Sequence, residues 1–471
     1  MHRKRIYGLE TEYAIYYVTP ISSPSIKRAL FSEYLIKALF ETLCPGETIY
    51  NLFLENGGRL YQDTGCHPEY ATPECSNIRD AVLYDIAGER ILNNISRKVQ
   101  QSFEEEGLLG KFKIFKNNTD SIGNTYGCHE NYLIRQDVNF SYLTEKIIPF
   151  LVTRTVFTGS GKYYISGNNI GFKISQRADF IEKVYSGSTT GDRPIINTRE
   201  EPLSDPTLYK RLHIIAGDSN ISPFTTYLKL GTMAIVLDMV ESGFFKREME
   251  IKNPLKALHD INEDITCQVK IEMKDGKYYT PLEIQEIYLE HAEKYCNNNN
   301  IDNEFKVILE NWKGVVQTLK TDPLKLADRI DWVIKLNLVE NYMKKNSRSD
   351  IGIRIQQLDI AYHDIDTDTG IFHRLENAGL VIRLFKEEEI ECATCNPPHD
   401  TRAHARGEIV KYLKKKGLVS AVDWSSINLE KIGAGKIIMN DPFDSTLDKF
   451  YKIKSKIQDL DSTITNPMPF Y

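Results

Sequence analysis

Charged and polar side chains alternate with other residues along two segments near the start of the chain. Arg59, Tyr61 and Asp63 stand two residues apart in one segment, and Glu10 and Glu12 do so in the other. Successive side chains of a β-strand point to opposite faces, so each set would share one face. A cation, a phenol and carboxylates are poorly suited to an apolar core. The segments therefore predict a sheet with one polar face, which favours antiparallel strands over a parallel sheet buried on both sides.

Hydrophobic periodicity predicts helices mixed with these strands, which gives an α+β fold. Ser76 is the expected N-cap of a long helix, and Ser222-Pro223 has the composition of a helix start. Helical patterns cover residues 25–44, 76–106, 140–158, 223–242 and most of 281–345. Strand patterns cover residues 4–18, 50–55, 58–63, 111–117, 125–134, 162–176 and 208–216.

Asn396-Pro397-Pro398 interrupts the helical pattern late in the chain. A helical pattern over residues 401–416 and a strand pattern over 420–430 follow it. We therefore expect a large catalytic domain over residues 1–395 and a small C-terminal α/β domain over residues 396–471.

The formal net charge of −6 gives no indication of a general affinity for nucleic acids or membrane surfaces. No stretch approaches the roughly 18 uninterrupted apolar residues of a membrane span, and the basic N-terminus lacks the apolar part of a secretory signal. The eight cysteines are scattered, and the Cys392-x-x-Cys395 pair has no second pair at zinc spacing. We expect a cytoplasmic protein with reduced thiols and no nucleic-acid or membrane partner.

Carboxylates gather around the two alternating segments. Hard cations such as Mg²⁺ prefer carboxylate oxygens and leave positions for water and phosphate, so one interpretation is a metal site. Solvent-facing carboxylates are the alternative. His129 and His213 lie in strand-like runs and could ligate a metal or contact phosphate, although a lone strand histidine is more often structural. The acidic set consists of Glu10, Glu12, Asp63, Glu69 and Glu74.

Further residues bear on catalysis and nucleotide binding. Asp63 is a candidate general base, although an aspartate at a strand end is more often a turn residue. Trp424 could stack on a base or pack in a core, and Arg199 is a candidate phosphate contact. Gly159-Ser160-Gly161-Lys162 is not a phosphate loop, because Tyr163 replaces the required Ser or Thr. Nucleotide binding would therefore use another fold.

Short motifs spread over nearly the whole chain are more specific together than any one of them. They are Gly8–Tyr13, Asn56–Asp63, Gly65–Cys75, Phe115–Asp120, Tyr126–Tyr132, Arg193–Arg199, Arg211–Asn220, Asp331–Lys335, Leu358–Ile365 and Asp441–Phe443. On these motifs the chain resembles the family of bacterial Pup ligases and Pup deamidases. The deamidase branch carries a long insertion ahead of the Asn56–Asp63 segment. Only about 50 residues separate Glu10 from Asp63, so the chain resembles the ligase branch more.

The resemblance implies a glutamine synthetase-like fold of the carboxylate–amine ligases and a reaction that uses ATP and Mg²⁺. ATP would phosphorylate the side-chain carboxylate of the C-terminal glutamate of a Pup-like protein modifier. A lysine of a substrate protein would then attack the γ-glutamyl phosphate and form an isopeptide bond.

The resemblance also implies roles for particular residues. Asp63 would deprotonate the incoming lysine, which is protonated at neutral pH. Glu12 and His213 are additional candidates for metal ligands. The magnesium ligands would be Glu10, Tyr61 and Glu69. The ATP contacts would be Arg59, Thr72 and Trp424, the last from the small C-terminal domain.

Two other functions stay open at this stage. One is a hydrolase of the same family, which would deamidate the modifier or release it from conjugates. The other is a catalytically inactive adaptor that binds the modifier. The missing insertion argues against the hydrolase, and the intact acidic set argues against the adaptor. The sequence does not say whether the modifier is Pup itself or a divergent relative.

Overall fold

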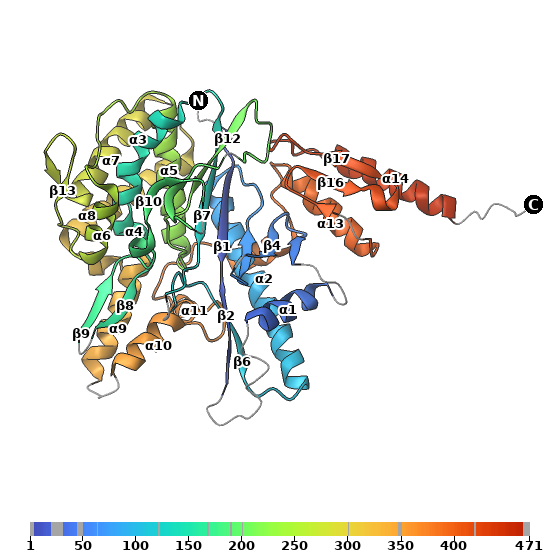
Figure 1. The fold of residues 1–471 in the computed structure, drawn as a ribbon, viewed down its shortest axis with the longest axis horizontal. Coiled ribbons are helices and arrows are strands. Elements are labelled where there is room, and N and C mark those ends of the chain that lie inside the picture. Colours follow the sequence, from blue (N-terminus) through green and yellow to red (C-terminus); the bar gives the residue numbers. More distant parts are fainter. Residues whose placement is uncertain are drawn as a thin grey trace, which may run out of the picture.

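The computed structural model places a central sheet between a large group of helices and a small C-terminal unit (Figure 1). It describes residues 4–19, 32–44, 50–63, 65–120, 123–166, 169–188, 191–199, 201–299, 301–346, 351–418 and 421–464. The first part of the helix expected over residues 25–44 therefore lies outside the described residues.

Within the described residues, the central sheet has eight strands in the order β10-β11-β12-β7-β1-β5-β4-β3. All neighbouring pairs are antiparallel except β10 and β11. The expected antiparallel-rich sheet is thus confirmed. In chain order the strands are β1 (Tyr7–Glu12), β3 (Asn51–Phe53), β4 (Arg59–Gln62), β5 (Pro68–Ala71), β7 (Cys128–Arg135), β10 (Lys183–Ser186), β11 (Pro194–Asn197) and β12 (Tyr209–Ile214).

The segment expected as one strand over residues 4–18 forms two strands. β1 runs in the central sheet, whereas β2 (Ala14–Val18) leaves it and pairs with β6 (Lys111–Phe115). β5 was not predicted as a strand, because it begins with Pro68 and all four of its side chains are buried, so it shows no alternation. Two separate hairpins complete this part of the chain: β8 (Lys162–Ser166) with β9 (Asn169–Lys173), and β13 (Ile271–Glu272) with β14 (Tyr278–Tyr279).

The long helix α2 (Ile78–Glu105) begins one residue later than expected. Asn77, not Ser76, is its N-cap: the Asn77 side-chain oxygen accepts a hydrogen bond from the Asp80 backbone N–H at 2.7 Å. Ser76 donates its hydroxyl to Asp400 instead. Ser222 caps α5 (Pro223–Glu241) as predicted.

The other helices before the C-terminal unit lie mainly in the group on the left of Figure 1. Among the described helices, none combines the length and apolar composition that crossing a bilayer requires. The helices before the C-terminal unit, other than α2 and α5, are α1 (Ser32–Leu43), α3 (Phe140–Thr153), α4 (Thr155–Thr158), α6 (Pro254–Glu263), α7 (Pro281–Asn298), α8 (Asn303–Thr321), α9 (Asp331–Lys345), α10 (Ile351–Ala361), α11 (Ile371–Asn377) and α12 (Glu387–Cys395).

One face of the sheet packs against α2. Thr11 on β1 donates its hydroxyl to Asp85 on α2 at 3.1 Å, and both side chains are buried. Tyr70 on β5 lies so close to Gly88 that a Cβ there would meet the Tyr70 ring at 2.2 Å. Gly88 thus permits the close approach of helix and sheet. The opposite side chains of β1, at positions such as Glu10, are less buried, which leaves the polar face open.

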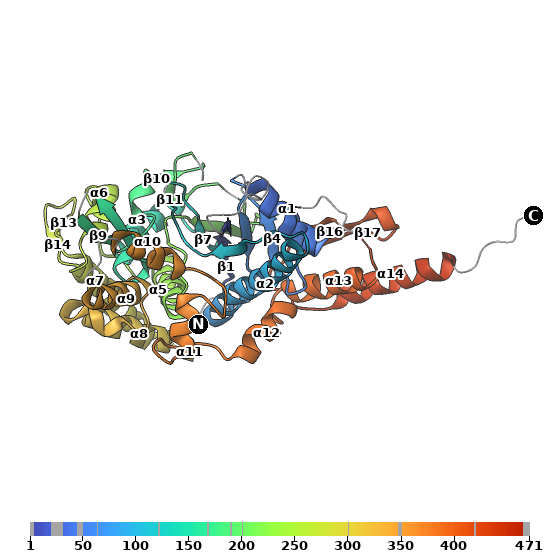
Figure 2. The same ribbon diagram turned by 90° about the horizontal axis from the view of Figure 1, so that it is seen from below.

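The C-terminal unit has its own apolar core, which includes Ile409, Ile427 and Ile453. It consists of α13 (Ala403–Lys415), α14 (Asp448–Ile464) and the sheet of β15 (Ala421–Val422), β16 (Ser426–Leu429) and β17 (Gly435–Ile438). Figure 2 shows α13 and α14 extending away from the rest of the molecule. The separate core supports our proposal that residues 396–471 form a small domain.

Candidate active site on the open sheet face

The strand register collects the predicted site residues into two rows on the open face. Glu12, Glu69 and Tyr61 lie opposite one another across β1, β5 and β4. Two residues along, Glu10 and Arg59 both lie opposite Ala71. Directly opposite residues of an antiparallel pair have Cβ atoms about 4.5–5.5 Å apart. Pairing between strands far apart in sequence thus brings the separate motifs together.

We call the group of Glu10, Glu12 and Glu69, with Tyr61 beside them, the acidic row. Without a cation, the negative charges of its carboxylates repel one another. Burial, together with the neighbouring Glu10 and Glu12 carboxylates, raises the pKa of Glu69 well above its ordinary value. Burial and the negative charges of Glu10 and Glu69 likewise raise the pKa of Tyr61 well above the usual value of a phenol. Carboxylate oxygens crowded on a partly open face fit the donor set that a hard divalent cation requires. The oxygen atoms of this group are therefore chemically suited to bind Mg²⁺.

Glu10 has hydrogen-bonding partners on β7 and an ion-pair partner on β12. Its carboxylate lies 3.3 Å from His129 Nδ1 and accepts a hydrogen bond from Asn131 Nδ2 at 3.0 Å, while Arg211 lies 3.5 Å away. Burial opposes ionisation, but the contact with His129 and the nearby His213 and Arg211 keep the pKa of Glu10 below its ordinary value. Glu10 is therefore held as a carboxylate.

His213 lies beside this group, with its ring centroid 5.1 Å from that of His129. Burial lowers the pKa of His213 to about 3, so the imidazole is neutral. Neither of its ring nitrogens has a hydrogen-bond partner in the described part of the chain. One ligand atom each from Glu10, His129 and His213 lie within 4.8 Å of one another. These three side chains are close enough to share a cation, and a metal-binding role for His213 stays a prediction.

Asp63 lies just past the end of β4 and forms a turn. Its Oδ1 atom accepts hydrogen bonds from the backbone N–H groups of Gly65 at 2.9 Å and His67 at 2.8 Å. Burial opposes ionisation, but the contacts with His67 and the hydrogen bond from Gly65 lower the pKa of Asp63 below its ordinary value. Asp63 is thus both a turn residue and an ionised carboxylate at the edge of the acidic row.

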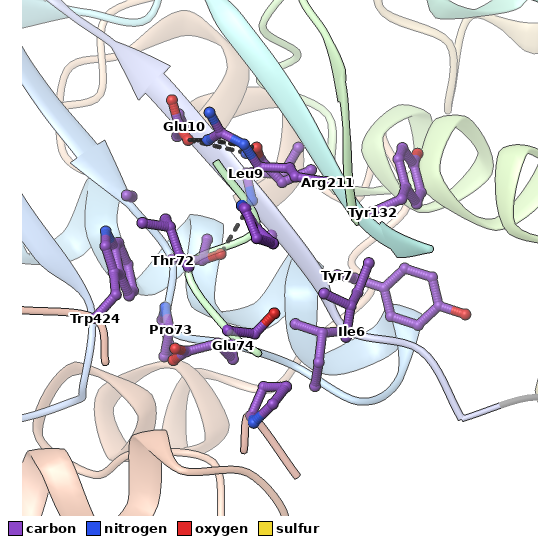
Figure 3. A pocket seen from close by; sticks show the side chains of 18 of the residues that line it. Ile6, Tyr7, Leu9, Glu10, Thr72, Pro73, Glu74, Tyr132, Arg211 and Trp424 are labelled. Atoms are coloured by element: carbon purple, nitrogen blue, oxygen red, sulfur yellow. Dashed lines mark hydrogen bonds and ion pairs between the residues drawn. The ribbon is translucent and has the colours of Figure 1, made fainter. Parts of the chain in front are cut away.

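A pocket adjoins the Glu10 end of this face (Figure 3). Thr72 and Trp424 both line it, and they come from the sheet and the C-terminal unit. The Thr72 hydroxyl accepts a hydrogen bond from the Leu9 backbone N–H at 3.1 Å, which fixes the end of β5 against β1. Figure 3 shows Glu10 and Arg211 at one end of the pocket and Trp424 across from them. The pocket therefore joins an apolar wall to a charged end.

Arg59 lies on β4 next to the acidic row. Its guanidinium carbon stands 4.3 Å from the centroid of the Tyr61 ring, and its Nε donates to Asn51 at 2.7 Å. Arg199 follows β11 on the His213 side of the site: its side chain is 56% exposed and approaches Glu201 at 3.9 Å, and its charge adds to the burial that lowers the pKa of His213. Arg59 therefore adjoins the acidic row, whereas Arg199 lies nearer to His213, and its contact with phosphate stays a prediction.

Glu74 has a structural role that the sequence analysis did not anticipate. It accepts a hydrogen bond from Arg402 Nε at 2.6 Å and forms an ion pair with Arg406. Burial opposes ionisation, but Arg406 and Arg402 lower the pKa of Glu74 to about 2. Arg406 also donates to the Trp424 carbonyl at 3.0 Å. Glu74 therefore does not belong to a metal site and instead attaches the C-terminal unit, with Trp424, to the sheet.

The sequence analysis did not single out Asn131, Arg211 or His67 as site residues. Asn131 stands two residues after His129, and Arg211 stands two residues before His213. The same alternation that revealed Glu10 and Glu12 could therefore have identified both. His67 lies in a loop between β4 and β5, where no periodic pattern applies.

Two solved structures share this fold. The Pup ligase PafA in its complex with the prokaryotic ubiquitin-like protein Pup matches with a TM-score of 0.89 and 32% identity, over 98% of this chain and 93% of that one. PafA in complex with ADP matches with a TM-score of 0.82 and 31% identity, over 94% and 99% of the two chains. The chain therefore has the fold of the Pup ligase PafA, which agrees with the α+β class and the ligase branch expected from the sequence.

Proteins of similar sequence belong to the same family as these two structures. The Pup–protein ligase of Kineococcus radiotolerans is 40% identical over 452 residues, which is 96% of this chain and 99% of that protein. The Pup–protein ligase of Acidimicrobium ferrooxidans is 39% identical over 455 residues, with coverage of 96% and 99%. The family model described as "Pup-ligase protein" matches residues 5–428.

The fold and the open acidic face together define an ATP-dependent ligase of the carboxylate–amine class. The chain belongs to the Pup-ligase family.

Proposed function

We propose that this chain is an ATP-dependent ligase that joins Pup, or a closely related modifier, to lysines of other proteins. The isopeptide bond would form at the side-chain carboxylate of the modifier's C-terminal glutamate. The observation that carries the proposal is the open acidic face of the sheet, which continues into a pocket bounded by Trp424. Family membership supports the ligase over the hydrolase and the inactive adaptor. Because the reaction consumes ATP, we infer a cytoplasmic location.

In this proposal the pocket takes ATP. Trp424 offers an aromatic wall for the adenine, and Thr72 lines the same pocket. The charged end at Glu10 and Arg211 would face the phosphates. Arg59, on the adjoining strand, would offset negative charge that develops as the γ-phosphoryl group is transferred.

Mg²⁺ would be held by Glu10, Tyr61 and Glu69, with Glu12 and His213 as further ligands. When bound, the ion neutralises polyphosphate charge during phosphoryl transfer. The raised pKa of Tyr61 keeps its hydroxyl protonated, so this residue contributes a neutral oxygen. The carboxylates supply the negative charge and orient the ion on the rigid sheet.

Asp63 would act in the second step. A lysine amine is protonated at neutral pH and cannot attack the γ-glutamyl phosphate until it loses a proton. The lowered pKa of Asp63 leaves the carboxylate free to accept a hydrogen bond from the incoming ammonium group and then its proton. The position of Asp63 at the end of β4 brings this base next to the acidic row.

The decisive experiment mixes the purified protein with ATP, Mg²⁺, Pup ending in glutamate, and a lysine-bearing target. Intact mass should show an ATP-dependent adduct equal to target plus Pup minus one water. Cleavage of a preformed conjugate, or deamidation of a C-terminal glutamine without ligation, would assign the chain to the hydrolase branch. Binding of Pup with no turnover of any kind would favour the adaptor.

A further inference from the structure

His67 lies between the proposed base and the acidic row. Its Nδ1 atom is 3.7 Å from Asp63 Oδ1 and also 3.7 Å from Glu12 Oε2. The other side of the imidazole meets the Tyr126 ring, with the centroids 4.5 Å apart. His67 thus connects the loop that carries Asp63 to β1, which carries Glu12.

The loop backbone is shaped to hold the imidazole in this place. A Cβ at Gly65 would lie 2.7 Å from His67 Cε1 and 2.9 Å from Nδ1, so only glycine leaves room for the ring. Cys66 adopts a positive φ of 59°, a conformation that is uncommon for a residue with a side chain. Strained backbone of this kind persists where the surrounding structure enforces it, and it concentrates at functional sites.

Backbone contacts tie the same two residues together. The His67 N–H donates to Asp63 Oδ1 at 2.8 Å, and the Asp63 N–H donates to the His67 carbonyl at 3.1 Å. The Asp63 carboxylate is therefore hydrogen-bonded to the His67 backbone and lies at ion-pair distance from His67 Nδ1. The His67 side chain adds a contact between the loop and the Glu12 carboxylate to the backbone pairing of β1 with β5.

We infer that His67 is a positioning residue for the lysine-deprotonation step: its Nδ1 holds the Asp63 carboxylate in register with Glu12 and the acidic row. This inference rests on the proposed function. In that step the lysine Nζ forms a bond to the γ-carbonyl carbon, the carbon–oxygen bond to phosphate breaks, and the proton passes from Nζ to Asp63. Phosphate leaves with the electron pair. His67 acts through Asp63 and takes no part in the bonds that form or break.

A matched pair of variants separates positioning from packing. In His67→Asn the side-chain amide reaches the place of Nδ1, whereas in His67→Gln it reaches the place of Nε2 and misses the two carboxylates. Both variants are polar and lose the ring contact with Tyr126 equally. The pair therefore differs mainly in the contact on which the inference depends.

The readout compares two acceptors under saturating ATP, Mg²⁺ and Pup. Lysine must be deprotonated, whereas hydroxylamine is already unprotonated at neutral pH and needs no base. We expect His67→Gln to lower kcat with the lysine acceptor by about 10- to 100-fold. Its rate with hydroxylamine and its KM for ATP should change less than about twofold, and His67→Asn should recover most of the lysine rate.

Three results would overturn the inference: an equal loss with both acceptors, no loss in His67→Gln, or the same loss in His67→Asn as in His67→Gln. Should either variant unfold, as judged by circular dichroism, His67→Phe restores a ring on Tyr126 and takes its place as the variant without a donor. Absence of any adduct from the wild-type protein would instead overturn the proposed function, and this inference with it.

Discussion

At the scale of single residues, Asp63 is the most direct test of the mechanism. Asp63→Asn keeps a side-chain oxygen that can accept the hydrogen bonds from Gly65 and His67, so the turn survives. The amide cannot take a proton from lysine, however. We expect conjugation to fall by about 10²- to 10⁴-fold, the usual contribution of a general base, while nucleotide affinity is unchanged. Rates by gel shift and affinities by calorimetry check this, and ordinary conjugation by the variant would remove Asp63 from the mechanism.

Glu69 tests whether the acidic row exists to hold a cation. Its pKa is raised by burial and by Glu10 and Glu12, so without metal the ionised form is unfavourable. Stability contributed by this carboxyl should therefore fall as pH rises above about 4.3, its ordinary pKa. Glu69→Gln removes the charge. We expect the free energy of unfolding of the metal-free protein to rise by about 1 kcal/mol, because replacing a functional residue that is held in an unfavourable environment commonly stabilises a protein.

The same variant should lose the stabilisation that Mg²⁺ gives the wild-type protein. Thermal unfolding in EDTA and in Mg²⁺ with a non-hydrolysable ATP analogue measures both effects. Glu290→Gln, an exposed charge removal on α7, is the control and should change neither. A Glu69→Gln protein that is less stable in EDTA and equally stabilised by Mg²⁺ would contradict the proposed ligand set.

Much of the site could be predicted, because alternation on a strand is a local signal. Glu10, Glu12, Arg59 and Tyr61 follow from spacing alone, and the register places them together. Glu74 was misassigned for the opposite reason. Its partner Arg406 lies 332 residues away, and nothing near Glu74 in the sequence indicates that pairing.

At the scale of elements, the helices and strands that depend on nearby residues were predicted, whereas those that depend on tertiary contacts were not. β1 and α5 followed from alternation and from a capping serine with proline. β5 was missed because all four of its side chains are buried, so the strand shows no alternation of buried and exposed positions. The cap of α2 fell on Asn77 instead of Ser76, since adjacent residues with equal capping ability differ only in tertiary contacts.

Where the C-terminal unit joins the sheet, the buried Glu74 carboxylate pairs with Arg402 and Arg406, at the start of α13. Glu74→Gln would leave Arg402 and Arg406 buried without a counter-charge, and removing one partner of a buried pair costs about 3–5 kcal/mol. Since the folded pKa is about 2, below the ordinary value, the stabilisation is present at neutral pH. It should disappear as pH falls from about 4 toward 2.

Urea unfolding at pH 7 measures the loss. Glu55→Gln is a matched control, because Glu55 pairs with Lys414 at 2.6 Å across the same junction, and the lysine side chain is 70% exposed. Exposed pairs contribute about 0–1 kcal/mol, so this variant should stay close to the wild type. Equal losses in the two variants would mean that the buried pair has no special part in the attachment.

At the scale of the whole molecule, the pocket is complete only when two separately packed units meet. Thr72 comes from the sheet, and Trp424 comes from the unit with its own core. Arg406 binds both sides, through Glu74 and through the Trp424 carbonyl. Nucleotide binding should therefore depend on how the C-terminal unit is seated as well as on the sheet itself.

Trp424 makes this dependence measurable. Of the three tryptophans in the chain, Trp312 and Trp332 are fully buried in the large core, so a fluorescence change on adding ADP reports on Trp424. Stacking of a base on an aromatic ring is worth about 1–3 kcal/mol, so Trp424→Ala should weaken ADP binding by about 5- to 150-fold. Trp424→Phe keeps a ring beside Phe53 and should retain most of the affinity while losing the fluorescence response. Unchanged affinity in Trp424→Ala would place the adenine elsewhere and leave the C-terminal unit without a part in nucleotide binding.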